Sequence, residues 1–148
     1  MARMAKWPGI VAAILIAIQF VPVDRRNFPA TDGPPAPVPV KTALRGACYD
    51  CHSNQTRWPW YSAVAPVSWW AAHEVNEGRR RLNFSAWSDY ASDPGTESQK
   101  LDEIANFVAS GAMAPWYYRA LHQEARLPKQ QRAQVVNWAR QQAGRIAQ

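Results

Sequence analysis

The sequence is poor in the residues that most often build metal cages. Only two of its 148 residues are cysteine, and only three each are histidine and methionine, so a zinc site with four cysteine ligands is excluded. Alternation of polar and apolar residues and internal repeats are also absent, which favours an all-α fold. The net charge is +6. The basic residues are scattered, apart from Arg79-Arg80-Arg81, and do not predict nucleic-acid binding.

Both cysteines stand in one short motif, Cys48-Tyr49-Asp50-Cys51-His52. Two cysteines at this spacing, followed directly by histidine, form the attachment signature of c-type haem. Each thiol would form a thioether with one vinyl group of the porphyrin, and the histidine would bind the iron on one face of the ring. On a helical turn, residues three apart share a face. We therefore predict one covalent haem c on Cys48 and Cys51, with His52 as the proximal iron ligand.

The same two cysteines allow other interpretations. A Cys-x-x-Cys pair is also typical of thiol–disulfide oxidoreductases and of half a zinc site. The redox motif usually lies between a strand and a helix, and no convincing strand pattern is near Cys48. A thiol–disulfide oxidoreductase using Cys48 and Cys51 is kept as an alternative function.

The N-terminal region, residues 1–26, is predicted to be a membrane anchor. A short head with Arg3 and Lys6 precedes the apolar stretch from Trp7 to Val23, which at about 17 residues is near the lower limit for a transmembrane helix. A cleaved signal peptide is the alternative, but no small-x-small cleavage site follows the stretch. Because haem is attached to c-type proteins outside the cytoplasm, we expect a single-pass protein of the bacterial inner membrane, with a cytoplasmic head and a periplasmic haem domain.

Residues 27–40 are predicted to be a linker, and residues 41–148 the haem-binding domain. The linker contains five prolines, which favour extended polyproline conformations and make a semi-rigid spacer. At about 3.1 Å per residue, such a spacer could hold the domain some 40 Å from the membrane. Helices are expected around residues 41–51, 67–80 and 128–147. A last helix that crosses the motif helix is typical of class I cytochrome c folds, so we expect a domain of this kind around one covalent haem.

The segment after the motif must run beside a haem bound at His52. It contains Arg57, Trp58, Trp60 and Tyr61, and the whole chain contains eight tryptophans. Aromatic side chains provide flat apolar walls and polar tips that can reach propionates. We predict that these four residues line the pocket or bind propionates. Simple packing of the aromatic residues, with a solvated Arg57, is the alternative.

Met113 is the predicted distal iron ligand. It follows the end of a predicted helix and lies two residues before Pro115, well downstream of His52. Small c-type cytochromes commonly supply a loop methionine near a proline, and its neutral thioether raises the reduction potential of the iron. His73 and His122 are alternative ligands. A methionine that only fills space in the core is the other possibility.

Several further motifs indicate a family. They are Cys51-His52-Ser53-Asn54, Trp58-Pro59-Trp60-Tyr61, Ala65-Pro66-Val67-Ser68-Trp69, Gly78-Arg79, Leu82-Asn83-Phe84-Ser85, Trp87, Met113-x-Pro115-x-Tyr117 and Leu121-His122. Over roughly residues 40 to 140 the chain resembles the bacterial haem-binding domain family, which consists of single-haem c-type proteins usually tethered at the N-terminus. That resemblance implies haem binding. The family commonly has Met-Pro-Pro where this chain has Met113-Ala114-Pro115.

The predicted function is that of a membrane-anchored monohaem cytochrome, which exchanges single electrons with an unidentified redox partner protein. A haem-based ligand sensor or a peroxidase-like enzyme with a displaceable sixth ligand is an alternative. The chain has one haem motif and no evident acid–base set, so electron transfer or haem binding is favoured over enzymatic activity.

Overall fold

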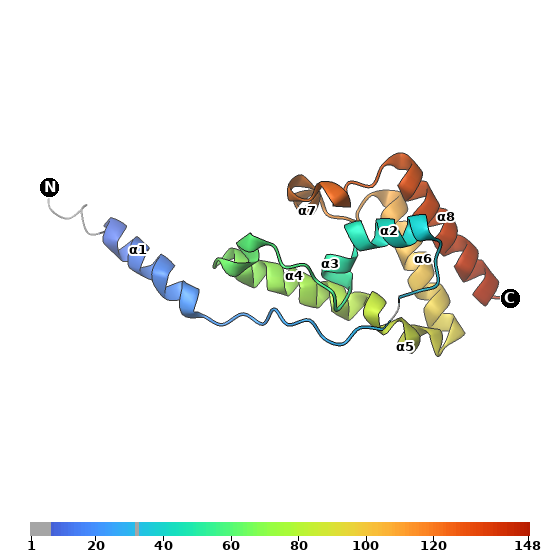
Figure 1. The fold of residues 1–148 in the computed structure, drawn as a ribbon, viewed down its shortest axis with the longest axis horizontal. Coiled ribbons are helices and arrows are strands. Elements are labelled where there is room, and N and C mark those ends of the chain that lie inside the picture. The colour runs from blue at the N-terminus through green and yellow to red at the C-terminus, as the bar shows by residue number, and fades with distance from the viewer. Residues whose placement is uncertain (1–6, 32) are drawn as a thin grey trace.

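The computed structural model describes residues 7–31 and 33–148 (Figure 1). All regular elements in these ranges are helical, which confirms the predicted all-α class. The elements are α1 (Trp7–Ala17), η2 (Ile18–Phe20), α2 (Val38–Ala47), α3 (Tyr49–His52), η3 (Trp60–Ala63), α4 (Val67–Arg81), η4 (Phe84–Ala86), α5 (Trp87–Ala91), α6 (Pro94–Ser110), α7 (Trp116–Leu121), η5 (Gln123–Ala125) and α8 (Lys129–Ile146).

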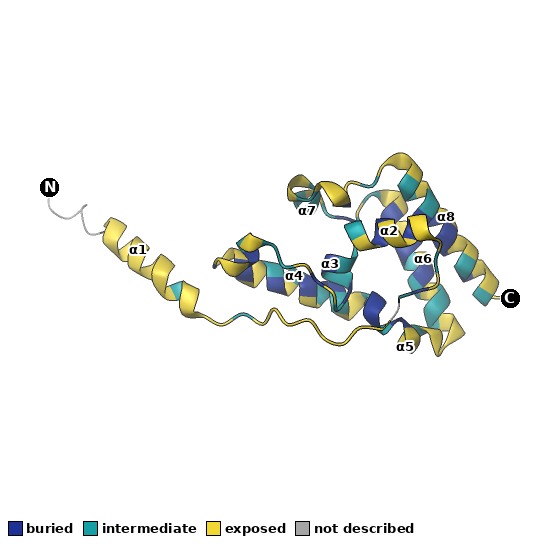
Figure 2. Cartoon of the chain, viewed as in Figure 1, coloured by how far each residue is buried: buried dark blue, intermediate teal, exposed yellow. Residues whose placement is uncertain are grey.

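The main core lies between α2, α6 and α8 (Figure 2). Leu101, Ile104 and Val108 recur at helical spacing on α6 and are all buried. They face Val135 of α8, which is 0% exposed, and Leu44 of α2, which is 2% exposed. Each such aliphatic side chain contributes about 1.5–3 kcal/mol on burial. This core fixes α2, and through it the motif that follows α2 directly.

Helix α6 is closed at both ends by its own sequence. The Asp93 side chain accepts a hydrogen bond from the Thr96 backbone N–H at 2.9 Å, and Pro94 occupies the first turn. These are favourable N-terminal features. At the other end, Gly111 has φ of 75°, a left-handed conformation that glycine adopts without a steric penalty. The helix therefore ends immediately before the loop that carries Met113.

The predicted transmembrane helix over residues 7–23 is not found. Helix α1 has 11 residues, and a short 3-10 turn follows it to Phe20. At 1.5 Å per residue, α1 is about 16 Å long, roughly half of the 30 Å hydrocarbon core. Among the described residues, none of the helices has the length and apolar character needed to cross a bilayer. The predicted basic head, residues 1–6, lies outside the described residues.

The proline-rich segment lies against the helical domain (Figure 1). The Asn27 side chain makes two hydrogen bonds with the Thr56 backbone, at 3.0 and 3.2 Å. The Pro29 carbonyl accepts a hydrogen bond from the Asn54 side chain at 2.7 Å. Helix α2 begins at Val38, and Val40 lies in the core. The segment is therefore attached along the domain, which differs from the expected free spacer; the predicted division into three regions stays a prediction.

Candidate functional site

The Cys-x-x-Cys-His motif folds as a single helical turn. Cys48 is the residue between α2 and α3, and its carbonyl accepts hydrogen bonds from the backbone N–H groups of Cys51, at 3.2 Å, and His52, at 2.8 Å. Both cysteines are free thiols with intermediate burial. Cys51 lines a cavity, whereas Cys48 packs against the core. One helical turn thus carries both predicted attachment cysteines and the predicted iron ligand His52.

The His52 ring is held in one orientation by two backbone carbonyls. Its Nδ1 lies 3.0 Å from the Gly78 oxygen and 3.1 Å from the Leu82 oxygen. Carbonyl oxygens only accept hydrogen bonds, so Nδ1 carries the proton and Nε2 keeps its lone pair. Burial lowers the pKa of His52, against the raising effect of these two hydrogen bonds. A neutral imidazole fixed through its other nitrogen is the usual arrangement of a metal-binding histidine.

Gly78 allows α4 to approach the motif closely. A Cβ atom at this position would collide with the Cys51 carbonyl oxygen and lie 2.9 Å from the Cys51 carbonyl carbon. Gly78 is buried within α4, which continues to Arg81. The predicted helix over residues 67–80 already contained Gly78. The close approach brings the Gly78 carbonyl oxygen to 3.0 Å from His52 Nδ1.

A cavity of about 310 Å³ lies beside the motif. Its volume is at the lower end of the range for ligand-binding pockets. Seven predicted site residues line it: Cys51, His52, Arg57, Trp58, Tyr61, His73 and Met113. Three others, Cys48, Trp60 and His122, are not part of its lining. The structure therefore brings the two predicted iron ligands, His52 and Met113, to the same cavity although they are distant in sequence.

The chemistry of the lining fits a haem. The cavity presents a thiol, a fixed imidazole, a thioether and several aromatic rings, which suit covalent attachment, axial ligation and contact with a flat apolar ring. Within the described part of the chain, the buried Trp58 indole N–H has no hydrogen-bond partner. A buried unsatisfied donor costs about 1–3 kcal/mol. A haem propionate is an acceptor of the kind that this N–H lacks.

A family model for the haem-binding domain matches residues 13–141. The chain belongs to the haem-binding domain family. Haem binding and the resemblance noted from the motifs are thereby confirmed. Neither a curated protein nor a solved structure matches the chain. The likeness to class I cytochrome c folds therefore stays a prediction.

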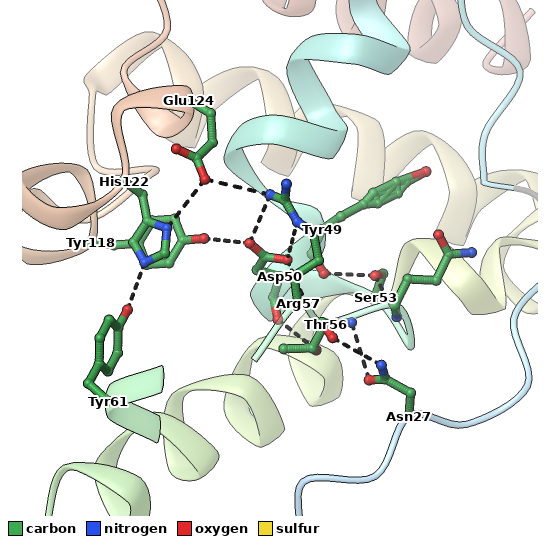
Figure 3. Close-up of polar contacts among 11 residues, drawn as sticks. Asn27, Tyr49, Asp50, Ser53, Thr56, Arg57, Tyr61, Tyr118, His122 and Glu124 are labelled. Atoms are coloured by element: carbon green, nitrogen blue, oxygen red, sulfur yellow. Dashed lines mark hydrogen bonds and ion pairs between the residues drawn. The ribbon is translucent and has the colours of Figure 1, made fainter. Parts of the chain in front are cut away.

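Asp50, inside the motif, is the centre of a polar network in this haem-binding domain (Figure 3). It is only 8% exposed. Its carboxylate accepts hydrogen bonds from the Arg57 backbone N–H and guanidinium, at 3.0 to 3.2 Å, and from the Tyr118 hydroxyl at 2.7 Å. The bond with Asp50 raises the pKa of Arg57. Burial, followed by the bond to Asp50, raises the pKa of Tyr118 far above its usual value.

His122 extends this network to Tyr61, which lines the cavity (Figure 3). Its ring stacks on Tyr118, with centroids 4.0 Å apart and an angle of 8°. Its Nε2 lies 2.7 Å from the Tyr61 hydroxyl, and its Nδ1 lies 3.4 Å from a Glu124 oxygen. Both ring nitrogens thus have partners, and the side chain ties α7 to η3. Because α7 follows Met113 closely, the network also connects the methionine loop to the haem motif.

The sequence interpretation missed Asp50, Glu74, Tyr117 and Tyr118 as cavity residues. Tyr117 donates a hydrogen bond to a Glu74 carboxylate oxygen at 2.7 Å and packs edge-on against Trp70. The only available signal was the Met-x-Pro-x-Tyr motif, which already includes Tyr117. The partners of these tyrosines are far away in sequence, so no local pattern identifies them.

The environment of the two thiols disfavours thiol–disulfide chemistry. Burial raises the pKa of Cys48 to about 12 and that of Cys51 to about 11. Catalytic thiols need the opposite shift, because the thiolate is the attacking species. These raised pKa values therefore argue against a thiol–disulfide oxidoreductase, and the family match supports haem binding by the domain.

Proposed function

We propose that this haem-binding domain protein is a membrane-attached monohaem c-type cytochrome that transfers single electrons. The observation that carries the proposal is that His52 and Met113 line one cavity, next to Cys51. When bound, haem would supply an iron that alternates between the ferric and ferrous states. The residues of the chain would hold the group and close both axial positions.

Each motif residue has a distinct role in this proposal. Cys48 and Cys51 would form the thioether bonds, and His52 would ligate the iron through Nε2. The carbonyls of Gly78 and Leu82 hold Nδ1–H, which supports this orientation of the ring. The Met113 sulfur would supply the second protein ligand of the iron. Two protein ligands leave no open site, which suits electron transfer better than ligand binding, and the neutral thioether favours reduced iron.

Membrane attachment through the N-terminal segment is part of the proposal. All residues of α1 are exposed, no residue of η2 is fully buried, and the sequence of α1 is apolar throughout. An α-helix that is apolar on all sides needs an apolar environment on all sides. The proposed location is the bacterial inner membrane, with the haem domain on the periplasmic side, where covalent haem attachment takes place.

The electron-transfer proposal is tested by the substitution Met113→Ala in the full chain. We expect a low-spin ferric spectrum with a weak band at about 695 nm, the mark of methionine ligation, which the substitution should abolish. His73→Ala and His122→Ala are matched controls, because they remove the alternative ligands, and the band should persist in both. A band that survives Met113→Ala would rule out this methionine as ligand.

Two further measurements separate the proposal from its competitors. Haem that stays with the denatured polypeptide in a pyridine haemochrome assay would establish covalent attachment and exclude free thiols. Carbon monoxide should bind the reduced protein slowly and incompletely at neutral pH, because Met113 would occupy the iron coordination site that carbon monoxide needs. Rapid and complete binding would instead indicate a ligand sensor or a peroxidase-like enzyme with a displaceable ligand.

A further inference from the structure

The end of the apolar N-terminal segment is attached to the loop that follows η3. The Gln19 side-chain amide donates to the Ala65 carbonyl at 3.2 Å and accepts from the Ala65 backbone N–H at 3.0 Å. Arg25 donates to the Ser62 carbonyl at 3.2 Å. These three bonds place the end of η2 beside the start of α4, as Figure 1 also shows. The apolar segment therefore leaves the domain from one defined end.

The same end of the domain carries exposed apolar side chains. Trp60 and Phe20 are both 82% exposed. We call the following set the apolar end: Phe20, Val21, Trp60, Val64 and Val67. Trp60 is a predicted haem-pocket residue, but it lies outside the lining of the 310 Å³ cavity and contacts Tyr61 edge-on. Its exposure therefore calls for another partner.

A lipid surface is the partner that this end fits best. The apolar end adjoins α1, which is apolar and exposed along its whole length (Figure 2). Tryptophan is enriched where membranes meet water, because its ring is apolar and its N–H is polar. Arg25 lies four residues after Val21 and suits anionic headgroups, whereas the charge of Arg26 is paired with Asp24 at 2.7 Å. A bilayer that takes up α1 would also reach side chains attached to the end of the same segment.

We infer that the apolar end rests on the lipid headgroups, so that the haem-binding domain lies directly on the membrane. The inference rests on the membrane attachment proposed above. It replaces the expected separation of about 40 Å by direct contact, since the residues of the spacer are hydrogen-bonded along the domain. Trp58, Pro59 and Tyr61 surround Trp60 in sequence and line the cavity. The wall of the haem site thus continues into the docking surface.

Site-directed spin labelling of the full-length haem protein tests this placement. Haem attachment uses both natural cysteines, so Trp60→Cys and Val64→Cys each introduce one free thiol for a nitroxide label. Phe107→Cys is the matched control, because Phe107 is a 49% exposed aromatic residue of α6. The proteins are reconstituted into vesicles of phosphatidylcholine and phosphatidylglycerol. All samples are kept ferric, because a reductant would also destroy the nitroxide, and each accessibility is the difference measured with and without the reagent, which cancels the constant contribution of the haem.

The readout is the accessibility of each label to oxygen, which enters lipid, relative to a water-soluble nickel chelate. Labels at residues 60 and 64 should have an oxygen-to-nickel ratio several-fold higher than the label at 107. Equal ratios at the three positions would overturn the inference and place the domain away from the bilayer. Labels at 60 shielded from both reagents would overturn it in favour of contact between two copies of the chain. The haem spectrum of the same samples reports separately on the proposed cytochrome.

Discussion

Tyr118→Phe is the substitution that most directly tests the coupling between the haem motif and the methionine loop. The Tyr118 hydroxyl lies 2.7 Å from a carboxylate oxygen of Asp50, inside the motif. Phenylalanine keeps the ring and its stacking on His122, at a centroid distance of 4.0 Å. The substitution therefore removes one hydrogen bond and little else.

The size of the effect follows from the remaining partners of the carboxylate. A hydrogen bond to a charged group contributes about 1.5–3 kcal/mol. Asp50 keeps its three bonds from Arg57 in the variant, so it is not left unsatisfied. We therefore expect a loss near the lower limit, about 1.5–2 kcal/mol of unfolding free energy. This corresponds to a decrease in Tm of roughly 3–8 °C for a protein of this size.

The assay is a double-mutant cycle with Asp50→Asn, measured by denaturant unfolding of the haem-loaded protein. Because the two side chains are directly bonded, the two substitutions should be non-additive by at least about 1 kcal/mol. Tyr117→Phe is the matched control, because its hydroxyl makes a bond of the same 2.7 Å length, but to Glu74. It should add independently to Asp50→Asn. Additive effects of Tyr118→Phe and Asp50→Asn would refute the proposed coupling.

Three further predictions concern packing, the unpaired indole and pH. Gly78→Ala should lower the unfolding free energy by about 1–2 kcal/mol, since overpacking against Cys51 outweighs the gain in helix propensity. The control is Gly144→Ala on α8, where no atom lies within 4 Å of the new Cβ. This control should raise the unfolding free energy by about 0.5–1 kcal/mol. Trp58→Phe should raise the pKa of a haem propionate, because it removes the donor that would stabilise the charged form; an unchanged pH dependence of the reduction potential would contradict this. Because the pKa of Tyr118 is raised in the folded protein, only the unfolded chain loses this proton just above pH 10, and the unfolding free energy should therefore decrease as pH rises beyond about 10. Denaturant titrations at several pH values should show a weaker decrease for Tyr118→Phe.

The parts of the site that are continuous in sequence could be predicted. Cys51 and His52 line the cavity because one helical turn places them there, and Trp58 and Tyr61 line it because they leave directly from that turn. Met113 could be proposed from its position after a helix end. The all-α class followed from the absence of alternating patterns.

Contacts between distant segments could not be predicted in the same way. Gly78 lies within the predicted helix over residues 67–80, and only its close approach to Cys51 explains why a glycine is found there. Asp50 reads as a variable position of the motif, although its carboxylate binds Arg57 and Tyr118. The N-terminal helix was expected to be longer because hydropathy measures apolar character and does not determine where a helix ends.

The unequal positions of the two thiols have a consequence for the biogenesis of the protein. Cys51 lines the cavity, whereas Cys48 packs against Ala47 and its neighbours between two parts of the core. If haem is joined to both thiols as proposed, the bond to Cys48 would form before α2 packs in this position, because here Cys48 is half-buried and does not line the cavity. Maturation would then be ordered in time: the prosthetic group is joined to an open chain, and folding around it follows.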